Sequence, residues 1–122
     1  MRRTIFIGWL MLISIGCLAD DVSQRIYDQF FMEAMVQRQK GNNDAAFDLL
    51  RHCQTLNPET PEVYYFLAQY YAALRNPEKA TECVKKAAAL NPDNETYMET
   101  LAQTYIQQQD YASAISVMEG LI

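Results

Sequence analysis

The most reactive side chains in this 122-residue chain belong to Cys53, Cys83 and His52. A thiol beside an imidazole can act as a nucleophilic pair, and cysteine and histidine are also the usual zinc ligands. His52 and Cys53 are adjacent, so on a helix their side chains point about 100° apart. No further ligand and no set of serine, histidine and acid can be assembled with them. The sequence therefore predicts a surface histidine and neither a metal site nor a catalytic one.

Two interpretations of the cysteines stay open. In an extracytoplasmic compartment Cys53 and Cys83 can form a disulfide, whereas two buried free thiols act as small apolar side chains. The second is favoured, because both fall at helix positions where small or apolar residues recur. The chain has no glycine-rich phosphate loop, and its acidic residues lie where helix starts and outer faces are expected. We therefore expect no enzyme activity and no cofactor.

The elements that must position any binding residue are set by an internal repeat. Leu56-Asn57-Pro58 returns further along the chain as Leu90-Asn91-Pro92. Between the two prolines, large and small apolar residues recur on one stripe of each of two short helices. The residues of this stripe are Tyr64, Leu67, Ala68, Tyr71, Ala80, Val84 and Ala87. Ala68 and Ala80 are expected to face each other where the two helices approach most closely, with no room for extra atoms.

Helix starts can be located on the same stretch. Thr60 before Pro61 is typical of a capping residue followed by a first-turn proline, and Asn76 before Pro77 repeats the pattern. Asn94 is expected to cap a further helix. Gly41 is expected to mark the turn inside an earlier helix pair. The displacement between the two tripeptides gives a period of about 34 residues, which divides the chain into repeats at 27–60, 61–94 and 95–122, the last one incomplete.

On these residues the chain resembles the tetratricopeptide-repeat family, and the resemblance covers residues 27–122. It implies an all-α solenoid of antiparallel helix pairs wound as a right-handed superhelix. It also implies that the first helix of each pair lines a concave groove that binds a protein or peptide. The groove residues that the resemblance assigns are Phe31, Met35, Arg38, Tyr65, Gln69, Ala72, Glu99, Gln103 and Ile106. Chaperone-binding members of the family place lysine and asparagine where Phe31 and Met35 stand, so their carboxylate clamp is not expected here.

An alternative for the groove stays open, because Phe31 and Met35 can instead pack under Val22 and Ile26.

The net charge of the chain indicates which class of partner to expect. The chain carries ten basic and 15 acidic residues, and Arg2 and Arg3 lie at its start. The remainder therefore has eight basic residues against 15 acidic ones, a net charge of −7. Nucleic acid is not expected as a partner.

The first 19 residues are predicted to be a secretory signal peptide, followed by a lead segment at 20–26. Two arginines precede an uncharged run from Thr4 to Ala19, which is shorter than the roughly 20 residues of a spanning helix. Cleavage is expected before Asp20, with a periplasmic or other extracytoplasmic location. Two alternatives would attach the protein to a membrane: an uncleaved signal, or lipidation of Cys17 in a lipoprotein-like box.

The whole chain resembles the amino-terminal part of larger exported bacterial repeat proteins. The predicted function is a non-catalytic scaffold that binds a protein or peptide in the groove. The alternative is a spacer or dimerisation module of a larger protein whose carboxy-terminal part is missing. The final helix has no following repeat to cover its apolar side chains, which are Ile115, Met118, Leu121 and Ile122. This pattern predicts a truncated chain as the favoured explanation, and self-association through this helix as the alternative.

Overall fold

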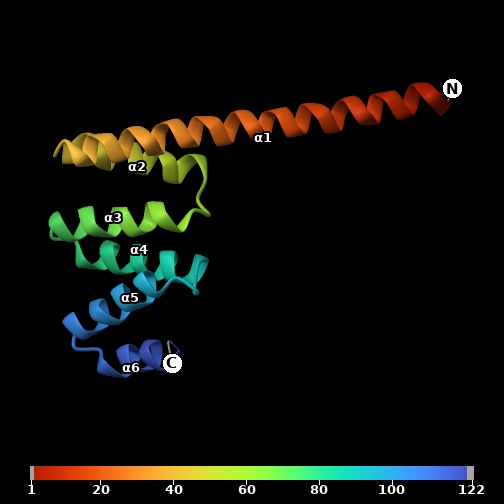
Figure 1. Ribbon diagram of the computed structural model, residues 1–122. Helices are drawn as coiled ribbons and strands as arrows, with labels where there is room; N and C mark the ends of the chain where they lie inside the picture. Colours follow the sequence, from red (N-terminus) through yellow and green to blue (C-terminus); the bar gives the residue numbers. More distant parts are fainter. Residues whose placement is uncertain (1, 121–122) are drawn as a thin grey trace.

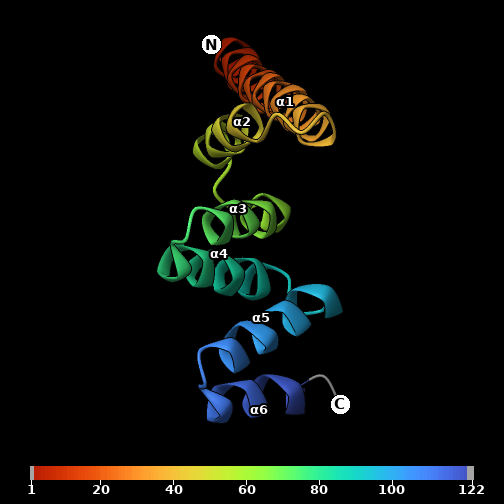
Figure 2. The same ribbon diagram turned by 90° about the vertical axis from the view of Figure 1, so that its left-hand side faces the viewer.

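The computed structural model describes the backbone of residues 2–120 and the side chains of residues 21–120. The elements follow in the order α1 (Arg2–Gln39), α2 (Asn43–Leu56), α3 (Pro61–Ala73), α4 (Pro77–Leu90), α5 (Glu95–Gln107) and α6 (Tyr111–Gly120). Within the described residues there is no strand. Figure 1 shows the helices stacked as three antiparallel pairs, and Figure 2 shows the same layers from the side. The predicted all-α solenoid of helix pairs is confirmed.

Local sequence sets the helix starts as expected in two cases out of three. The side chains of Asn76 and Asn94 each accept a hydrogen bond from the backbone N–H three residues later, at 3.3 and 3.1 Å. The side chain of Thr60 makes no such bond. Its hydroxyl instead donates to the carbonyl of Asn57 at 3.2 Å. The fixed backbone of Pro61 at the first helical position therefore starts α3 without a side-chain cap.

The turn inside each helix pair has one conformation, repeated three times. Gly41, Arg75 and Gln109 occupy the same position in successive repeats and have φ angles of 82°, 59° and 61°. In each turn the N–H of this residue bonds to the carbonyl three residues back, and the next N–H bonds to the carbonyl five residues back. This is the Schellman motif, in which a left-handed residue satisfies the last carbonyls of a helix. Only the first turn uses the glycine that the conformation favours.

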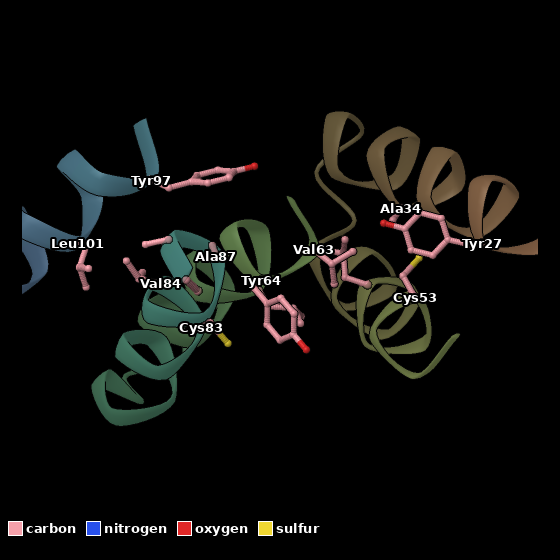
Figure 3. Packing of buried hydrophobic residues seen from close by; sticks show 14 residues of the cluster. Tyr27, Ala34, Cys53, Val63, Tyr64, Cys83, Val84, Ala87, Tyr97 and Leu101 are labelled. Carbon is pink, nitrogen blue, oxygen red and sulfur yellow. The ribbon is translucent and has the colours of Figure 1, made fainter. Parts of the chain in front are cut away.

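The core is continuous from one pair to the next (Figure 3). Tyr27 of α1 lies against Cys53 of α2, and the same row continues through Val63, Val84 and Leu101. The largest side chains that are fully enclosed are Leu50, Leu67, Val63 and Cys53. Ala34 and Ala46 are completely buried where α1 and α2 approach each other. The array therefore has a single apolar seam, to which every helix from α1 to α6 contributes.

The amino-terminal region is helical and joins the first repeat without a break. α1 spans the expected signal peptide, the expected lead segment and the first repeat helix, and its amino-terminal half projects beyond the stack (Figure 1). In the part of the chain that the structure describes, no helix has the length and apolar character needed to cross a membrane. Cleavage before Asp20 and lipidation of Cys17 stay predictions. Leu121 and Ile122 lie outside the described residues.

Candidate functional site

The first helices of the three pairs, α1, α3 and α5, carry all nine of the predicted groove residues. Four of these are partly buried: Phe31, Met35, Arg38 and Tyr65. The other five are exposed: Gln69, Ala72, Glu99, Gln103 and Ile106. The partly buried residues belong to α1 and to the start of α3, and the exposed ones to the rest of α3 and to α5. The structure thus divides the expected groove into a packed part and an open part.

The packed part is a row of aromatic rings that crosses all three first helices. Tyr27 stacks on Phe31 at 6.0 Å between ring centroids, and Phe31 meets Phe66 of α3 at 6.3 Å. Phe66 continues to Tyr65 at 5.6 Å, and Tyr65 to Tyr97 of α5 at 5.2 Å. Such pairs stabilise by about 0.5–1.5 kcal/mol each beyond the area that they bury. Phe31 and Tyr65 therefore help to join neighbouring repeats as well as forming groove surface.

The alternative position for Phe31, under the lead segment, is not the one observed. Val22 and Ile26 are 51% and 38% exposed, and the ring contacts of Phe31 are to Tyr27 and Phe66. Met35 packs against the edge of the same core. These two side chains thus pack against the core of the first two repeats.

Arg38 bridges α1 and α3 at the rim of the groove. Its guanidinium donates from Nη2 to the Oε1 atom of Gln69 at 2.6 Å and lies 4.6 Å from the centre of the Phe66 ring. A cation above an aromatic face is attracted by the ring's quadrupole. The bridge occupies the amide oxygen of Gln69, so the NH2 group of that amide is left to donate to another molecule.

The open part contains a cavity of about 620 Å³ between α3, α4 and α5. Its floor and walls are formed by Tyr65, Ala68, Gln69, Ala72, Arg75, Pro77, Ala80, Thr81, Val84, Thr100, Thr104, Gln107 and Gln108. The volume lies within the range typical of ligand sites, about 300–1,000 Å³. Ala68 and Ala80 are both buried, as expected, but both border this space. Both alanines therefore have open space on the side that faces the cavity, and the expectation that no room is left beside them is wrong on that side.

Hydroxyl and amide groups form the polar edge of this cavity. The hydroxyl of Thr81 donates to the carbonyl of Pro77 at 2.7 Å and accepts from Nε2 of Gln108 at 2.6 Å. The hydroxyl of Thr104 donates to the carbonyl of Thr100, also at 2.7 Å. These threonine donors are satisfied within the protein. Glutamine amides and one arginine remain as the groups that can donate to a ligand.

The third repeat lines the cavity with residues other than those expected. Glu99, Gln103 and Ile106 are absent from the cavity wall, and Thr100, Thr104 and Gln107 form it. One residue along a helix turns the side chain by about 100°, so α5 presents the face next to the expected one. Sequence reasoning missed these three residues because the repeat pattern fixes which side of α5 meets its own partner helix. It does not fix how the pair is rotated against the preceding one.

A smaller cavity of about 260 Å³ lies on the other side of α3. It is lined by Arg38, Asn43, Asp44, Phe47, Gln69, Tyr70, Ala73 and Leu74. Gln69 borders both cavities. The hydroxyl of Tyr70 is buried and has no hydrogen-bond partner in the structure. The two hollows follow one another across α3 and adjoin at Gln69, whose bond to Arg38 lies at their common edge.

The larger cavity lacks the side chains that most often carry catalysis. It is lined by no histidine, cysteine or acid, and its single charged residue is Arg75. Cys53 and Cys83 are buried and unpaired, and burial raises the pKa of each thiol to about 11, so both are protonated near neutral pH. His52 is exposed on α2, with its ring 4.5 Å from that of Phe30. Within residues 21–120, no three metal-binding side chains come together.

Comparisons with known proteins agree with this architecture. A family model described as anaphase-promoting complex, cyclosome, subunit 3 matches residues 30–121. No curated protein matches the chain by sequence.

Solved structures resemble the chain in fold. A crystal structure of MamA is 18% identical with a TM-score of 0.68, covering 77% of this chain and 55% of its own. The Sgt2 TPR domain from Aspergillus fumigatus is 22% identical (TM-score 0.63; 77% and 62% covered). The chaperone SycD of Yersinia enterocolitica, in complex with a peptide of the translocator YopD, is 17% identical (TM-score 0.65; 76% and 71%). The chain thus spans about half the length of the MamA chain that it matches.

Proposed function

The chain belongs to the tetratricopeptide-repeat family named for subunit 3 of the anaphase-promoting complex, or cyclosome, and we propose that it is an exported, non-catalytic scaffold. Its concave groove binds a segment of another protein. The observation that carries this proposal is the cavity of about 620 Å³ between α3, α4 and α5, which combines an apolar floor with amide and hydroxyl edges. Apolar pockets with a few polar groups at the edge are typical of sites for peptides and small molecules.

Two further observations support a protein or peptide as the ligand. A structural relative, SycD, has been crystallised with a peptide of the protein YopD. The groove of the present chain also extends over more than one repeat, because the two cavities adjoin at Gln69. An extended segment can fill both hollows, whereas a compact small molecule fills one. The acidic balance of the chain disfavours nucleic acid.

Site-specific crosslinking in the cells that make the protein tests this proposal. A photo-reactive amino acid at Gln107, exposed on the first helix α5 and part of the cavity wall, is expected to trap a defined partner. The same amino acid at Ala89, exposed on the second helix α4 and outside the cavity lining, is the control. Equal crosslinking from both positions, or none from Gln107, would contradict the groove as the binding surface.

A second candidate function is a spacer or dimerisation module within a larger protein. The exposed apolar side chains of α6 favour it: Tyr111 is 57% exposed, Ile115 55% and Met118 42%. An apolar face of this kind promotes association with another surface. Placing the photo-reactive group at Ser116, an exposed neighbour on α6, distinguishes the candidates. The module predicts crosslinks between two copies of the chain from Ser116, and the scaffold predicts a different protein from Gln107.

A further inference from the structure

The cavity between α3, α4 and α5 has room for a large side chain over an apolar floor. Its floor consists of small or compact residues, with Ala68 and Ala72 from α3 and Pro77, Ala80 and Val84 from α4. Three alanines leave space where longer side chains would fill it. A leucine, methionine or phenylalanine placed there would exchange water for an apolar floor, which is the favourable direction of transfer.

The cavity carries a positive charge at the end that lies next to the carboxyl end of α3. Arg75 is exposed there and is the single charged residue of the lining, although the chain as a whole is acidic. Its backbone is fixed by the turn, because its N–H donates to the carbonyl of Ala72 at 3.0 Å and its φ is 59°. A guanidinium with five donors is suited to a carboxylate. The charge at this end thus complements an acidic ligand.

The walls of the cavity suit the backbone of an extended chain. The amide of Gln69 on α3 keeps its NH2 group free for a carbonyl, because its oxygen accepts from Arg38. Gln107 carries a second amide on the opposite wall, on α5. Amide side chains both donate and accept, as the peptide backbone does. The polar edge therefore requires no particular side chain from the ligand.

The apolar floor and the charge are neighbours in the fold. Ala72 belongs to the floor, and Arg75 follows three residues later in the turn after α3 ends at Ala73. A ligand with an apolar side chain on the alanine floor therefore has a nearby residue within reach of Arg75.

We propose that this cavity recognises an extended peptide that carries a large apolar residue and, at a short and constant spacing from it, an acidic residue. The apolar side chain fills the space over Ala68, Ala72 and Val84, and the acidic side chain pairs with Arg75. The proposal rests on the scaffold function and names the ligand of its groove. The acid is that of a side chain within the segment and not that of a chain end, because the groove continues past Gln69 into the smaller cavity.

Selection from a phage-displayed library of random dodecapeptides on the purified full chain tests the inference. The expected result is enrichment of peptides that carry Leu, Met or Phe at one constant, short spacing from Asp or Glu. Ala72→Trp fills the cavity from an exposed position and is expected to weaken these peptides at least about ten-fold. Its matched control is Ala89→Trp, an exposed alanine of α4 outside the cavity lining, which is expected to bind like the parent.

Charge reversal gives a second, independent measurement. Arg75→Glu is expected to change the preferred residue from an acid to a lysine or arginine, with about ten-fold weaker binding of the acidic peptides. Lys86→Glu makes the same change of charge at an exposed position of α4 outside the cavity and is expected to leave the preference unchanged. Circular dichroism of each variant checks that helicity is kept.

The outcomes separate this inference from the proposed function. Enriched peptides without the pattern, or peptides whose binding is insensitive to both Ala72→Trp and Arg75→Glu, overturn the inference and leave the scaffold intact. Absence of any enriched peptide on the parent chain overturns both. If Ala72→Trp lowers helicity, the change of charge preference in Arg75→Glu decides the question by itself.

Discussion

The three Schellman turns permit a reciprocal test of how backbone conformation affects stability. Gly41 and Gln109 occupy equivalent positions in the first and third repeats, and both have left-handed backbone angles, with φ of 82° and 61°. Gly41→Ala adds a side chain where the conformation disfavours one. Gln109→Gly removes a side chain from the same conformation. The two substitutions are expected to change the free energy of unfolding in opposite directions.

The magnitude follows from two opposing terms. The left-handed conformation costs an L-residue about 1–2 kcal/mol relative to glycine. Glycine gains more conformational freedom on unfolding, which offsets about 0.5–1 kcal/mol of that difference. A Cβ atom added at Gly41 has no heavy atom within 4 Å, so no clash contributes. The net expectation is a loss of about 0.5–1 kcal/mol for Gly41→Ala and a gain of the same size for Gln109→Gly.

Urea and thermal unfolding followed by circular dichroism measure these differences. For a domain of this size, the shift of the melting temperature is about 2–8 °C, downward for Gly41→Ala and upward for Gln109→Gly. Gly120→Ala is the control, because Gly120 lies in α6 without a left-handed angle and its added Cβ also meets open space. A Gly41→Ala variant as stable as the parent, or a destabilised Gln109→Gly, would refute the reasoning about the turns.

Three further predictions concern export, thiols and association. Mass spectrometry of the exported protein is expected to show a chain that begins at Asp20; an intact first methionine would contradict this. Burial raises the pKa of Cys53 and Cys83 from 9.0 to about 11, so the folded chain keeps protons that the unfolded chain loses. Below about pH 9 these thiols should therefore not change how the free energy of unfolding depends on pH. Between about pH 9 and pH 11 the free energy of unfolding should fall, and it should fall less in a variant with alanine at both positions. Replacing Ile115 and Met118 by serine should lower any self-association seen by light scattering, and an unchanged particle size would exclude this face.

Sequence reasoning predicted the parts of the fold that depend on residues close together in the chain. The repeat period located the start of α3 at Pro61, and Asn76 and Asn94 cap the helices that follow them. The two cysteines are buried and free, as favoured. In each case a local rule is sufficient: an amide side chain bonds three residues ahead, or an apolar residue falls on the buried stripe of its own helix.

Features that depend on contacts between repeats could not be predicted in the same way. Arg75 and Gln109 give no sign of a left-handed turn, because the motif is usually marked by glycine. Thr100 and Thr104 line the cavity in place of Glu99 and Gln103, since the rotation of α5 depends on how the whole third pair sits against the second. A pattern within one repeat contains no information on that rotation.

The cavity itself follows from a change in side-chain size along the first helices. At the amino-terminal ends of α3 and α5, the rings of Tyr65 and Tyr97 are in contact, 5.2 Å apart. Towards the carboxyl ends, the facing residues are small or polar, such as Ala72 and Thr104, and Figure 1 shows the two helices diverging in that direction. Aromatic contact at one end with short side chains at the other makes a wedge. Because α4 closes the bottom of that wedge with Ala80 and Val84, the opening becomes a lined pocket and not a gap between repeats.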